Sequence, residues 1–452
     1  MPADILNLSS YTVTGIDENE HDYRIEASVT KTLSGCIHCF QNTIRGFGRR
    51  EQLIKDLPMH GKRVGIYVDT RRYQCLNCNK TFYEPLPDVD EKRKMTKRLV
   101  DWIGKQAISR TFASLAEEVG IVEGTVRSIF RDCINELEKT VRFEIPQWMG
   151  IDEIHLIKPR CVVSNTRNNT IVEILKDRNK TTVTRYLCRL KGLDQVHYVA
   201  MDMWRPYRDA VETVIPDAQI VIDKFHVVRM ANDALERVRK SLREPLTPKQ
   251  RRGLVNDRFV LLKRERDLSD KEVFLLDGWC RNYPELGLAY RQKEDFYGIY
   301  EAKSPAEAKA KFNTWLRALT PEIGDAFNDL ASAWQNWEPY ICNYFNHPVT
   351  NAYTESLNNL IRVMNRLGRG YSFEALRAKI LFSEGTFKTE KKRPKFQRKQ
   401  AEKVAGRFIG YSLMTDVPDF MRRSTDDQST EGVKNYGVDI SIITAMIKEG
   451  LI

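Results

Sequence analysis

Short apolar runs alternate with longer amphipathic segments in the middle of the chain. The runs are rich in β-branched residues and too brief for ordinary helices, so they predict buried strands. Strands are expected at residues 147–157, 160–164, 170–175, 196–202 and 219–223, and helices at residues 181–190 and 207–215. A polar turn joins the second and third strands into a hairpin, whereas a helix joins the last two. We therefore expect a mixed sheet whose final strands are parallel.

Three aspartates occupy particular positions in this pattern. Asp202 and Asp223 end the fourth and fifth runs, and Asp152 lies in the first. Functional groups in such sheets gather at the carboxyl ends of the strands. Alternatively, Asp202 and Asp223 are ordinary strand-end residues that cap a turn or a helix. With an aspartate in the first strand and another ending the fourth, the order of elements is the ribonuclease-H-like arrangement.

The N-terminal part carries two Cys-x-x-Cys pairs after a weakly alternating segment that predicts small strands. The pairs are Cys36/Cys39 and Cys75/Cys78, a pattern typical of a structural zinc ribbon in which four thiolates hold one Zn²⁺. Two unrelated redox or chance pairs are the alternative. His38 lies inside the first pair as a further candidate ligand, although four cysteines suffice. We expect zinc to support folding here, because so short a β unit buries little apolar area.

A basic, helical segment begins at Asp88. Residues 99–108 carry one apolar face, and residues 114–131 fit a helix-turn-helix with Gly120 at the turn. Glycine adopts the left-handed conformation that lets one helix stop and the next cross it. The second helix is expected to present four side chains to a groove of DNA: Thr125, Arg127, Ser128 and Arg131. A plain helical hairpin is the alternative.

The chain stays helical for more than a hundred residues after His226, interrupted by prolines, which predicts an all-α insertion. Its tryptophans are expected in the core rather than as stacking platforms: Trp279, Trp315, Trp334 and Trp337. A further helix begins near Asn351 and carries Glu355. Between residues 388 and 407 there are nine basic and two acidic residues, which indicates a solvated face or tail and, secondarily, a phosphate-tracking surface.

Composition narrows the class of protein. Lys and Arg outnumber Asp and Glu by 72 to 61 among 452 residues, and the net charge of +11 favours a polyanionic partner. No apolar run is long enough to span a membrane. The nine cysteines, together with an N-terminus that lacks the features of a signal peptide, predict a reducing cytoplasm.

Asp152, Asp202 and Glu355 form the candidate catalytic group. The first and fourth strands of the expected sheet are neighbours, so their aspartates can converge with the glutamate of the later helix. Clustered carboxylates are best tolerated around divalent cations, and two Mg²⁺ or Mn²⁺ ions can clamp the attacking and leaving oxygens of a phosphodiester displacement. His226 can donate to a phosphate oxygen or be a packed histidine, and Asp223 can orient His226 or support the metal site. The sequence contains no nucleophile elbow, the motif that would indicate a Ser-His-Asp hydrolase, so we set that class of enzyme aside.

Four strings carry a resemblance to a known family: Ile151-Asp152-Glu153, Ala200-Met-Asp202-Met-Trp-Arg-Pro-Tyr207, Asp223-Lys-Phe-His226 and Thr354-Glu355-Ser-Leu-Asn358. Together they resemble the bacterial insertion-sequence transposases of the ISL-three family, which belong to the DDE transposases. The resemblance implies Asp152, Asp202 and Glu355 as the catalytic triad and the four cysteines as zinc ligands. The string that ends at His226 is also similar to a signature of Mutator-like relatives, which carry a helical insertion before the final glutamate.

The resulting hypothesis is a multidomain DNA transposase that recognises terminal inverted repeats and carries out metal-dependent strand cleavage and strand transfer. We expect a zinc ribbon at 1–87, a helix-turn-helix at 88–145, a ribonuclease-H-like domain at 146–228 and 346–386, an α-helical insertion at 229–345 and a basic tail at 387–452. Double-stranded DNA is the expected partner, in the bacterial cytoplasm near the nucleoid. A homodimer or larger assembly is expected, because two ends must be joined. A DNA-binding regulator on an inactive scaffold and a structure-specific nuclease are the alternatives.

Overall fold

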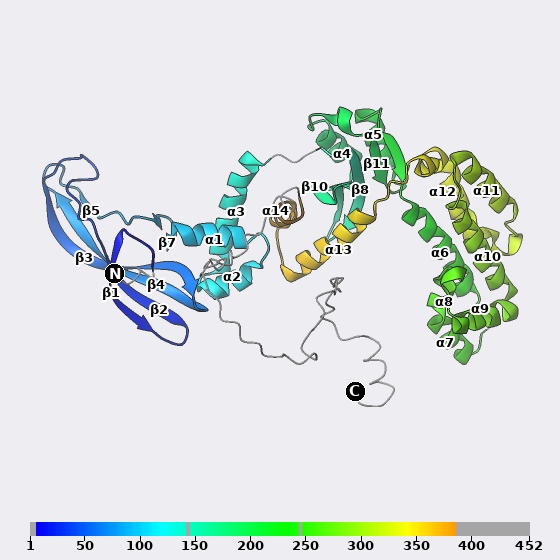
Figure 1. The fold of residues 1–452 in the computed structure, drawn as a ribbon, viewed down its shortest axis with the longest axis horizontal. Helices are drawn as coiled ribbons and strands as arrows, with labels where there is room; N and C mark the ends of the chain where they lie inside the picture. Colours follow the sequence, from blue (N-terminus) through cyan, green and yellow to red (C-terminus); the bar gives the residue numbers. More distant parts are fainter. Residues whose placement is uncertain (1–5, 142–144, 244–245, 386–452) are drawn as a thin grey trace, which may run out of the picture. The chain divides into compact units, whose positions relative to one another are not determined.

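The computed structural model describes residues 6–141, 145–243 and 246–385 (Figure 1). The basic run at residues 388–407 lies outside this part of the chain. Among the described residues, no helix combines the length and the apolar character needed to cross a membrane.

A β sheet with a core of its own forms the N-terminal part. Its strands are β1 (Tyr11–Glu18), β2 (Asp22–Val29), β3 (Ile44–Met59), β4 (Lys62–Cys75), β5 (Thr81–Tyr83), β6 (Val89–Asp90) and β7 (Met95–Thr96). They are ordered β1-β2-β4-β3-β7-β6, with β5 paired to β4. The long β3–β4 hairpin closes at His60 and Gly61, both of which have positive φ.

Apolar side chains on one face of this sheet make up its core, including Ile25, Ile54, Ile66 and Val68. The expectation that the β unit buries little apolar area was therefore wrong for the sheet as a whole. It holds for the end that carries the cysteines, where Cys36, Cys75 and Phe82 form a small separate cluster. The reason is β4, which buries every second residue from Val64 to Thr70, and the end of β3 that pairs with it, where Ile54 is buried.

Three helices follow: α1 (Lys97–Gln106), α2 (Phe112–Val119) and α3 (Glu123–Thr140). Side chains cap two of them, since Thr96 accepts from the backbone of Leu99 and Thr111 accepts from that of Ser114. Gly120 ends α2 in the left-handed conformation, with φ 70° and ψ 46°, as the sequence predicted. The turn between α2 and α3 is thus a helix-turn-helix connection made possible by glycine.

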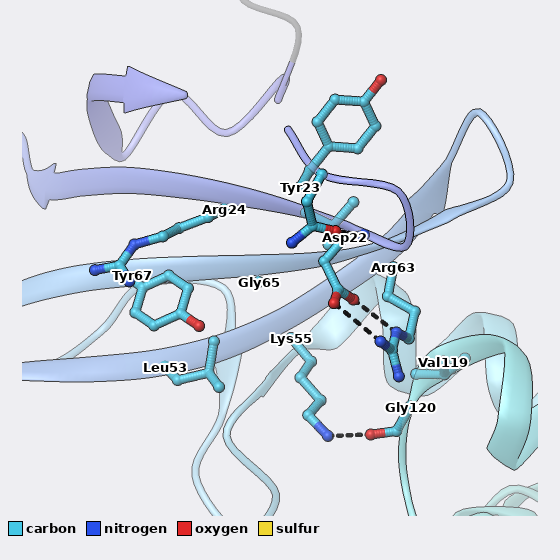
Figure 2. A pocket seen from close by; sticks show the side chains of 12 residues that line it. Asp22, Tyr23, Arg24, Leu53, Lys55, Arg63, Gly65, Tyr67, Val119 and Gly120 are labelled. Carbon is cyan, nitrogen blue, oxygen red and sulfur yellow. Dashed lines mark hydrogen bonds and ion pairs between the residues drawn. The ribbon is translucent and has the colours of Figure 1, made fainter. Parts of the chain in front are cut away.

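Side chains of the sheet reach this turn. Lys55 of β3 donates to the carbonyl of Gly120, and Arg63 of β4 packs against the same glycine while Asp22 accepts from its guanidinium at 2.6 and 2.9 Å (Figure 2). Arg93, in the segment between β6 and β7, donates to the hydroxyl of Ser128 on α3 at 3.3 Å. The sheet and the helix-turn-helix therefore share a polar boundary.

A second sheet contains β8 (Trp148–His155), β9 (Pro159–Asn165), β10 (Thr170–Leu175), β11 (Tyr198–Met201) and β12 (Gln219–Ile222). Its order is β10-β9-β8-β11-β12. The first three strands are antiparallel, and β8, β11 and β12 are parallel. The first and fourth strands are hydrogen-bonded neighbours, as expected. Helices α4 (Lys180–Leu187) and α5 (Arg205–Val214) connect β10 to β11 and β11 to β12.

A long helical region lies between β12 and the last two helices of the sheet domain. It comprises α6 (Lys224–Ser241), α7 (Pro248–Asn256), α8 (Arg258–Leu262), α9 (Asp270–Asn282), α10 (Pro284–Ile299), α11 (Pro305–Arg317) and α12 (Pro321–Asn346). Four of these helices begin with proline at the first helical position, where its missing N–H costs nothing. Trp315, Trp334 and Trp337 are buried as predicted, and Trp279 is half-buried.

The two faces of the second sheet pack on different partners. One face shares a hydrophobic cluster with α4, α5 and the helical region. The other face shares a cluster with α13 (Ala352–Leu367), α14 (Phe373–Glu384) and the helix-turn-helix. Asp152 lies on this second face, because it pairs with Val162 and has the same parity along β8 as Ile154.

Candidate functional site

Three aspartates are aligned across neighbouring parallel strands. In the register of the sheet, Met201 pairs with Ile151 on one side and with Ile222 on the other. The residues that follow these three are Asp152, Asp202 and Asp223. The sequence folds in this way because each apolar strand is buried up to the aspartate. The carboxylates therefore meet at one edge of the sheet.

His226 lies at the centre of the acidic cluster. Ligand atoms of Asp152, Asp202 and His226 are all within 4.8 Å of one another, and so are those of Asp223, His226 and Glu355. The structure thus brings together all five residues singled out in the sequence, in two groups that share the histidine. Glu355 is grouped with Asp223 rather than directly with Asp202.

The carboxylates of this cluster are poorly compensated. Asp152 and Asp223 are 5% and 1% exposed. Burial raises the pKa of Asp152 to about 7 and that of Asp202 to about 6, and it also raises the pKa of Glu355. The pKa of His226 is raised as well, chiefly by Asp223, whose Oδ2 lies 3.6 Å from Nδ1 of the imidazole. A further positive charge would stabilise this arrangement.

The donor atoms fit a divalent cation. Among the described residues, Asp202 Oδ1 is buried without a hydrogen-bond partner, and the buried Asp223 Oδ2 and His226 Nδ1 have only the 3.6 Å contact with one another. Buried polar atoms without partners are costly unless an ion or water satisfies them. Carboxylate oxygens are hard ligands of the kind that Mg²⁺ and Mn²⁺ prefer. The residues present are therefore compatible with the metal that the sequence predicts.

Asp223 has a second, structural role. Its side chain caps α6 by accepting from the backbone N–H of Phe225 at 3.4 Å. The capping alternative considered for the strand-end aspartates therefore applies to Asp223. It does not apply to Asp202, because α5 has no side-chain cap.

Helix α13 is fixed to the sheet by buried polar side chains to which the sequence gave no role, although Thr354 and Asn358 belong to one of the strings that carry the family resemblance. Asn358 donates to Asp152 Oδ2 at 2.9 Å, and Asn351 donates to the carbonyl of Ile151 at 3.4 Å. Between them, the hydroxyl of Thr354 lies 2.6 Å from that of Ser164. These three helix residues are three and four positions apart, so they form one stripe on α13. That polar stripe was the signal from which they could have been found.

The close approach of α13 depends on Gly150 of β8. A Cβ atom at this position would lie less than 3.0 Å from Ser164 Oγ, Asn351 Oδ1 and Thr166 Cγ2. Glu355 follows Asn351 by one helical turn. The absence of a side chain at Gly150 therefore contributes to the position of Glu355.

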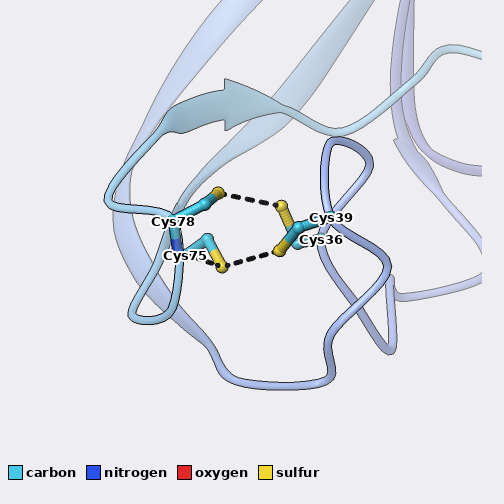
Figure 3. A group of neighbouring side chains, drawn as sticks. All are labelled: Cys36, Cys39, Cys75 and Cys78. Atoms are coloured by element: carbon cyan, nitrogen blue, oxygen red, sulfur yellow. Dashed lines mark hydrogen bonds between the residues drawn. The ribbon is translucent and has the colours of Figure 1, made fainter.

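The four cysteines of the N-terminal pairs form a compact group (Figure 3). Their sulfur atoms lie within 4.8 Å of one another, with 3.7 Å between Cys36 and Cys78 and 3.6 Å between Cys39 and Cys75. The backbone N–H of Cys78 donates to Cys75 and lowers the pKa of that thiol to about 6. Four converging thiols of which one readily ionises fit a structural Zn²⁺ site.

The four predicted DNA contacts lie on or beside the outer side of α3. Val126, Ile129, Phe130 and Ile134 face the core. Ser128 and the exposed Arg131 lie on the opposite side, and Thr125 and Arg127 flank them. Arg127 is not free, because it pairs with Glu123 at 2.6 Å and lies over the ring of Phe112.

Comparisons with known proteins give a consistent result. A family model described as a transposase, of the DDE type of ISL3 (ISL-three), matches residues 149–380. Models for the zinc-finger of transposase IS204/IS1001/IS1096/IS1165 and for the helix-turn-helix domain of transposase family ISL3 match residues 33–78 and 84–134. The chain is 23% identical over 326 residues to the transposase for insertion sequence element IS1001 of Bordetella parapertussis, covering 70% of this chain and 80% of the relative. It is 24% identical over 300 residues to the transposase for IS1557 of Mycobacterium tuberculosis, covering 60% and 67%.

Proposed function

The chain belongs to the ISL3 family of transposases, and from this premise we propose that it binds the ends of an insertion sequence and carries out metal-dependent DNA strand cleavage and strand transfer. The resemblance seen in the sequence is thereby confirmed at the level of the family. Its helix-turn-helix and transposase domains imply DNA binding, and its zinc-ribbon match and four-cysteine group support a structural Zn²⁺.

The meeting of Asp152, Asp202, Asp223 and Glu355 around His226 carries the proposal for the chemistry. A regulator that only binds DNA needs no such cluster of buried carboxylates, whose charge costs free energy. The strand order β10-β9-β8-β11-β12, with three antiparallel strands followed by two parallel ones, supports a ribonuclease-H-like fold for this domain.

Asp152, Asp202 and Glu355 would hold the metal, with Asp223 beside Glu355. A bound pair of Mg²⁺ or Mn²⁺ ions supplies the charge stabilisation needed for in-line displacement at a phosphodiester. The protein's own groups prepare the site. Asn358 orients one oxygen of Asp152, and Asp223 orients the imidazole of His226, which can donate to a phosphate oxygen.

DNA recognition is assigned to residues 1–145 and cleavage to the sheet domain of residues 146–228 and 346–386. The helical region of residues 229–345 is an insertion within the sheet domain, and the segment expected at residues 387–452 lies outside the described residues. Joining two ends requires two copies of the chain to act together, so a homodimer or a larger assembly on double-stranded DNA is part of the proposal.

The test uses the full-length protein with Asp152→Asn and Glu355→Gln. Both variants should bind duplex DNA that carries the element's ends with wild-type affinity and should show no cleavage in Mg²⁺ or Mn²⁺, because each removes a charged ligand while keeping the shape of the side chain. Glu285→Gln, an exposed change on α10, is the matched control and should cleave normally.

Cleavage by both acidic-site variants at the wild-type rate would refute the assigned chemistry. Wild-type protein that binds the ends but never cuts them would favour the regulator. Cutting without joining pre-cut ends to a plasmid target would favour the nuclease.

A further inference from the structure

A cleft lies between the N-terminal sheet and the helix-turn-helix. Its larger cavity, of about 590 Å³, is bounded by β3 and β4, by the segment that precedes β7, and by the start of α3. A neighbouring cavity of about 380 Å³ shares Leu53, Lys55, Arg63 and Gly120 with it (Figure 2). The two cavities lie beside the turn of the helix-turn-helix and have these four lining residues in common.

Cationic side chains dominate the lining of this cleft. Five of them line the larger cavity: Lys55, Arg63, Lys92, Arg93 and Lys94. Of the residues that the structure describes, none that lines the larger cavity is acidic, and Asp22 is the one acidic residue that lines the smaller one. Such an excess of one charge in a confined space attracts counter-ions.

The cations differ in how far they are already neutralised. Arg63 is paired with Asp22, and Arg93 is paired with Asp90 at 3.3 Å and also with Asp132. Lys92 and Lys94 are exposed and form no ion pair with a described carboxylate. These two lysines remain available for an anionic partner.

Lys55 lies close to another positive charge. Burial is the larger cause that lowers the pKa of its ammonium group, and the positive charge of Arg63 lowers this pKa further. Its ammonium group donates to the carbonyl of Gly120, which satisfies one of its three donors. An anion placed in the cleft would relieve the remaining repulsion.

The first turn of α3 opens onto the same cleft. Val122, the residue before the helix, provides no side-chain cap and is 71% exposed, and Gly124 leaves open space beside the backbone. Thr125, one of the predicted DNA contacts, lines the larger cavity. The helix that is expected to enter a groove of DNA therefore begins where the cationic cleft ends.

We propose that this cleft binds the phosphate backbone of double-stranded DNA beside the segment contacted by α3, so that the N-terminal sheet is part of the DNA interface. The inference rests on the proposed function in taking duplex DNA as the partner. Within the DNA-recognition region of residues 1–145, it identifies side chains of β3, β4 and the segment before β7 as phosphate contacts beside those expected from α3.

A double substitution of exposed lysines tests the cleft by removing charge without disturbing packing. Lys92→Gln/Lys94→Gln removes its two unpaired lysines. Lys105→Gln/Lys139→Gln is the matched control, since it removes two exposed lysines of the helix-turn-helix that lie away from the cleft and whose side chains are 70% and 67% exposed. A third variant, Asp22→Asn, is compared with them. Far-ultraviolet circular dichroism and thermal melts establish that the wild type and all three variants are folded.

Duplex binding is measured for each protein over a series of salt concentrations. Each lost phosphate contact lowers the magnitude of the slope of log K against log[salt] by about 0.9, so the Lys92/Lys94 variant should lower it by about 1.8. Affinity should fall by the same factor for end DNA and for an unrelated duplex, because phosphates carry no sequence information. The control pair should leave the slope unchanged.

Asp22→Asn provides a test in the opposite direction. It removes the carboxylate that neutralises Arg63, so it should steepen the salt slope by up to about 0.9. Equal effects of the cleft pair and the control pair, or a slope that Asp22→Asn leaves unchanged or reduces, would overturn the proposal.

A failure of the cleft proposal can be distinguished from a failure of the proposed function. Wild-type protein that shows the predicted salt dependence but cuts no DNA would leave the cleft established and refute the cleavage chemistry. If the wild type cuts the ends normally, but the Lys92/Lys94 variant and the Lys105/Lys139 variant bind duplex DNA with the same salt dependence, only the proposal for the cleft is refuted.

Discussion

Replacing Gly150 by alanine tests how α13 is held against the sheet. The new Cβ would lie less than 3.0 Å from Ser164 Oγ, Asn351 Oδ1 and Thr166 Cγ2. Ser164 and Asn351 are buried and are both hydrogen-bonded to the hydroxyl of Thr354. Moving either side chain therefore breaks a buried hydrogen bond, and leaving them in place forces the start of α13 away from β8.

The cost follows from those two choices. Overpacking a tight site costs about 1–3 kcal/mol, and leaving a buried polar group without its partner costs about 1–3 kcal/mol. Because one or the other cost applies, we expect Gly150→Ala to lower the free energy of unfolding by about 1–3 kcal/mol. A misplacement of about 1 Å can cost about 10²-fold in rate, so cleavage should fall by at least that factor because Glu355 moves with the helix.

The assay combines denaturant unfolding with single-turnover cleavage at saturating enzyme, so that weaker DNA binding does not contribute. Gly278→Ala is the matched control, since this exposed glycine of α9 has open space where the Cβ would be placed. It should gain about 0.5–1 kcal/mol of stability and cleave normally. Wild-type stability of Gly150→Ala would refute the packing argument, and wild-type cleavage by a destabilised Gly150→Ala would refute the role of α13 in placing Glu355.

Three further predictions concern the zinc group, the helical region and α14. Cys75→Ser should reduce bound zinc from about one ion per chain to none, and metal-free wild-type protein that folds and binds DNA normally would contradict this. Trp334→Ala should lower stability by about 3–5 kcal/mol without changing DNA affinity in a filter-binding assay, because Trp334 is buried and stacked on Phe312 at 4.6 Å. Burial lowers the pKa of Lys379 from 10.5 to about 8. Between these two pH values the unfolded chain keeps a proton on this lysine that the folded chain has released, so the folded state gains stability as the pH rises. The free energy of unfolding of the wild type, relative to that of Lys379→Met, should therefore increase by about 3 kcal/mol from pH 8 to pH 10.5 in a series of denaturant titrations. A difference that is independent of pH would contradict this prediction.

The elements of the second sheet were accessible from the sequence because their signals are local. Each strand is a brief apolar run that ends at a polar residue, and α4 and α5 lie within a few residues of the helices expected at residues 181–190 and 207–215. Boundaries were harder where a cap decides them. Helix α6 begins at Lys224, whereas the sequence indicated helix from His226 onward, because the side chain of Asp223 accepts from the first turn.

The long strands of the N-terminal sheet were not anticipated. Residues 44–59 include charged, proline and glycine residues, and their pairing with β4 depends on partners outside the local pattern. The extended hairpin supplies buried positions only once both strands are in register. A pattern read along one strand cannot show this burial.

The acidic residues of the site could be found from strand ends, but their grouping could not. The sequence places Asp202 ahead of Asp223 as a ligand on the basis of strand order. The structure puts Asp223, and not Asp202, in the group that contains Glu355, and His226 belongs to both groups. The docking of α13 on the sheet places Glu355, and that docking depends on contacts between segments far apart in the chain.

Helix α14 ties the DNA-binding helices to the sheet that carries the acidic residues. Arg377 donates to Glu173 on β10 at 2.6 Å and to Glu138 on α3 at 3.2 Å. Lys379, which is 1% exposed, donates to the carbonyl of Ala107 just after α1 and lies over the ring of Phe112 on α2. A displacement of α3 relative to the acidic cluster must therefore break these contacts or carry α14 along. We therefore expect DNA binding by α3 to be coupled to the geometry of the cluster.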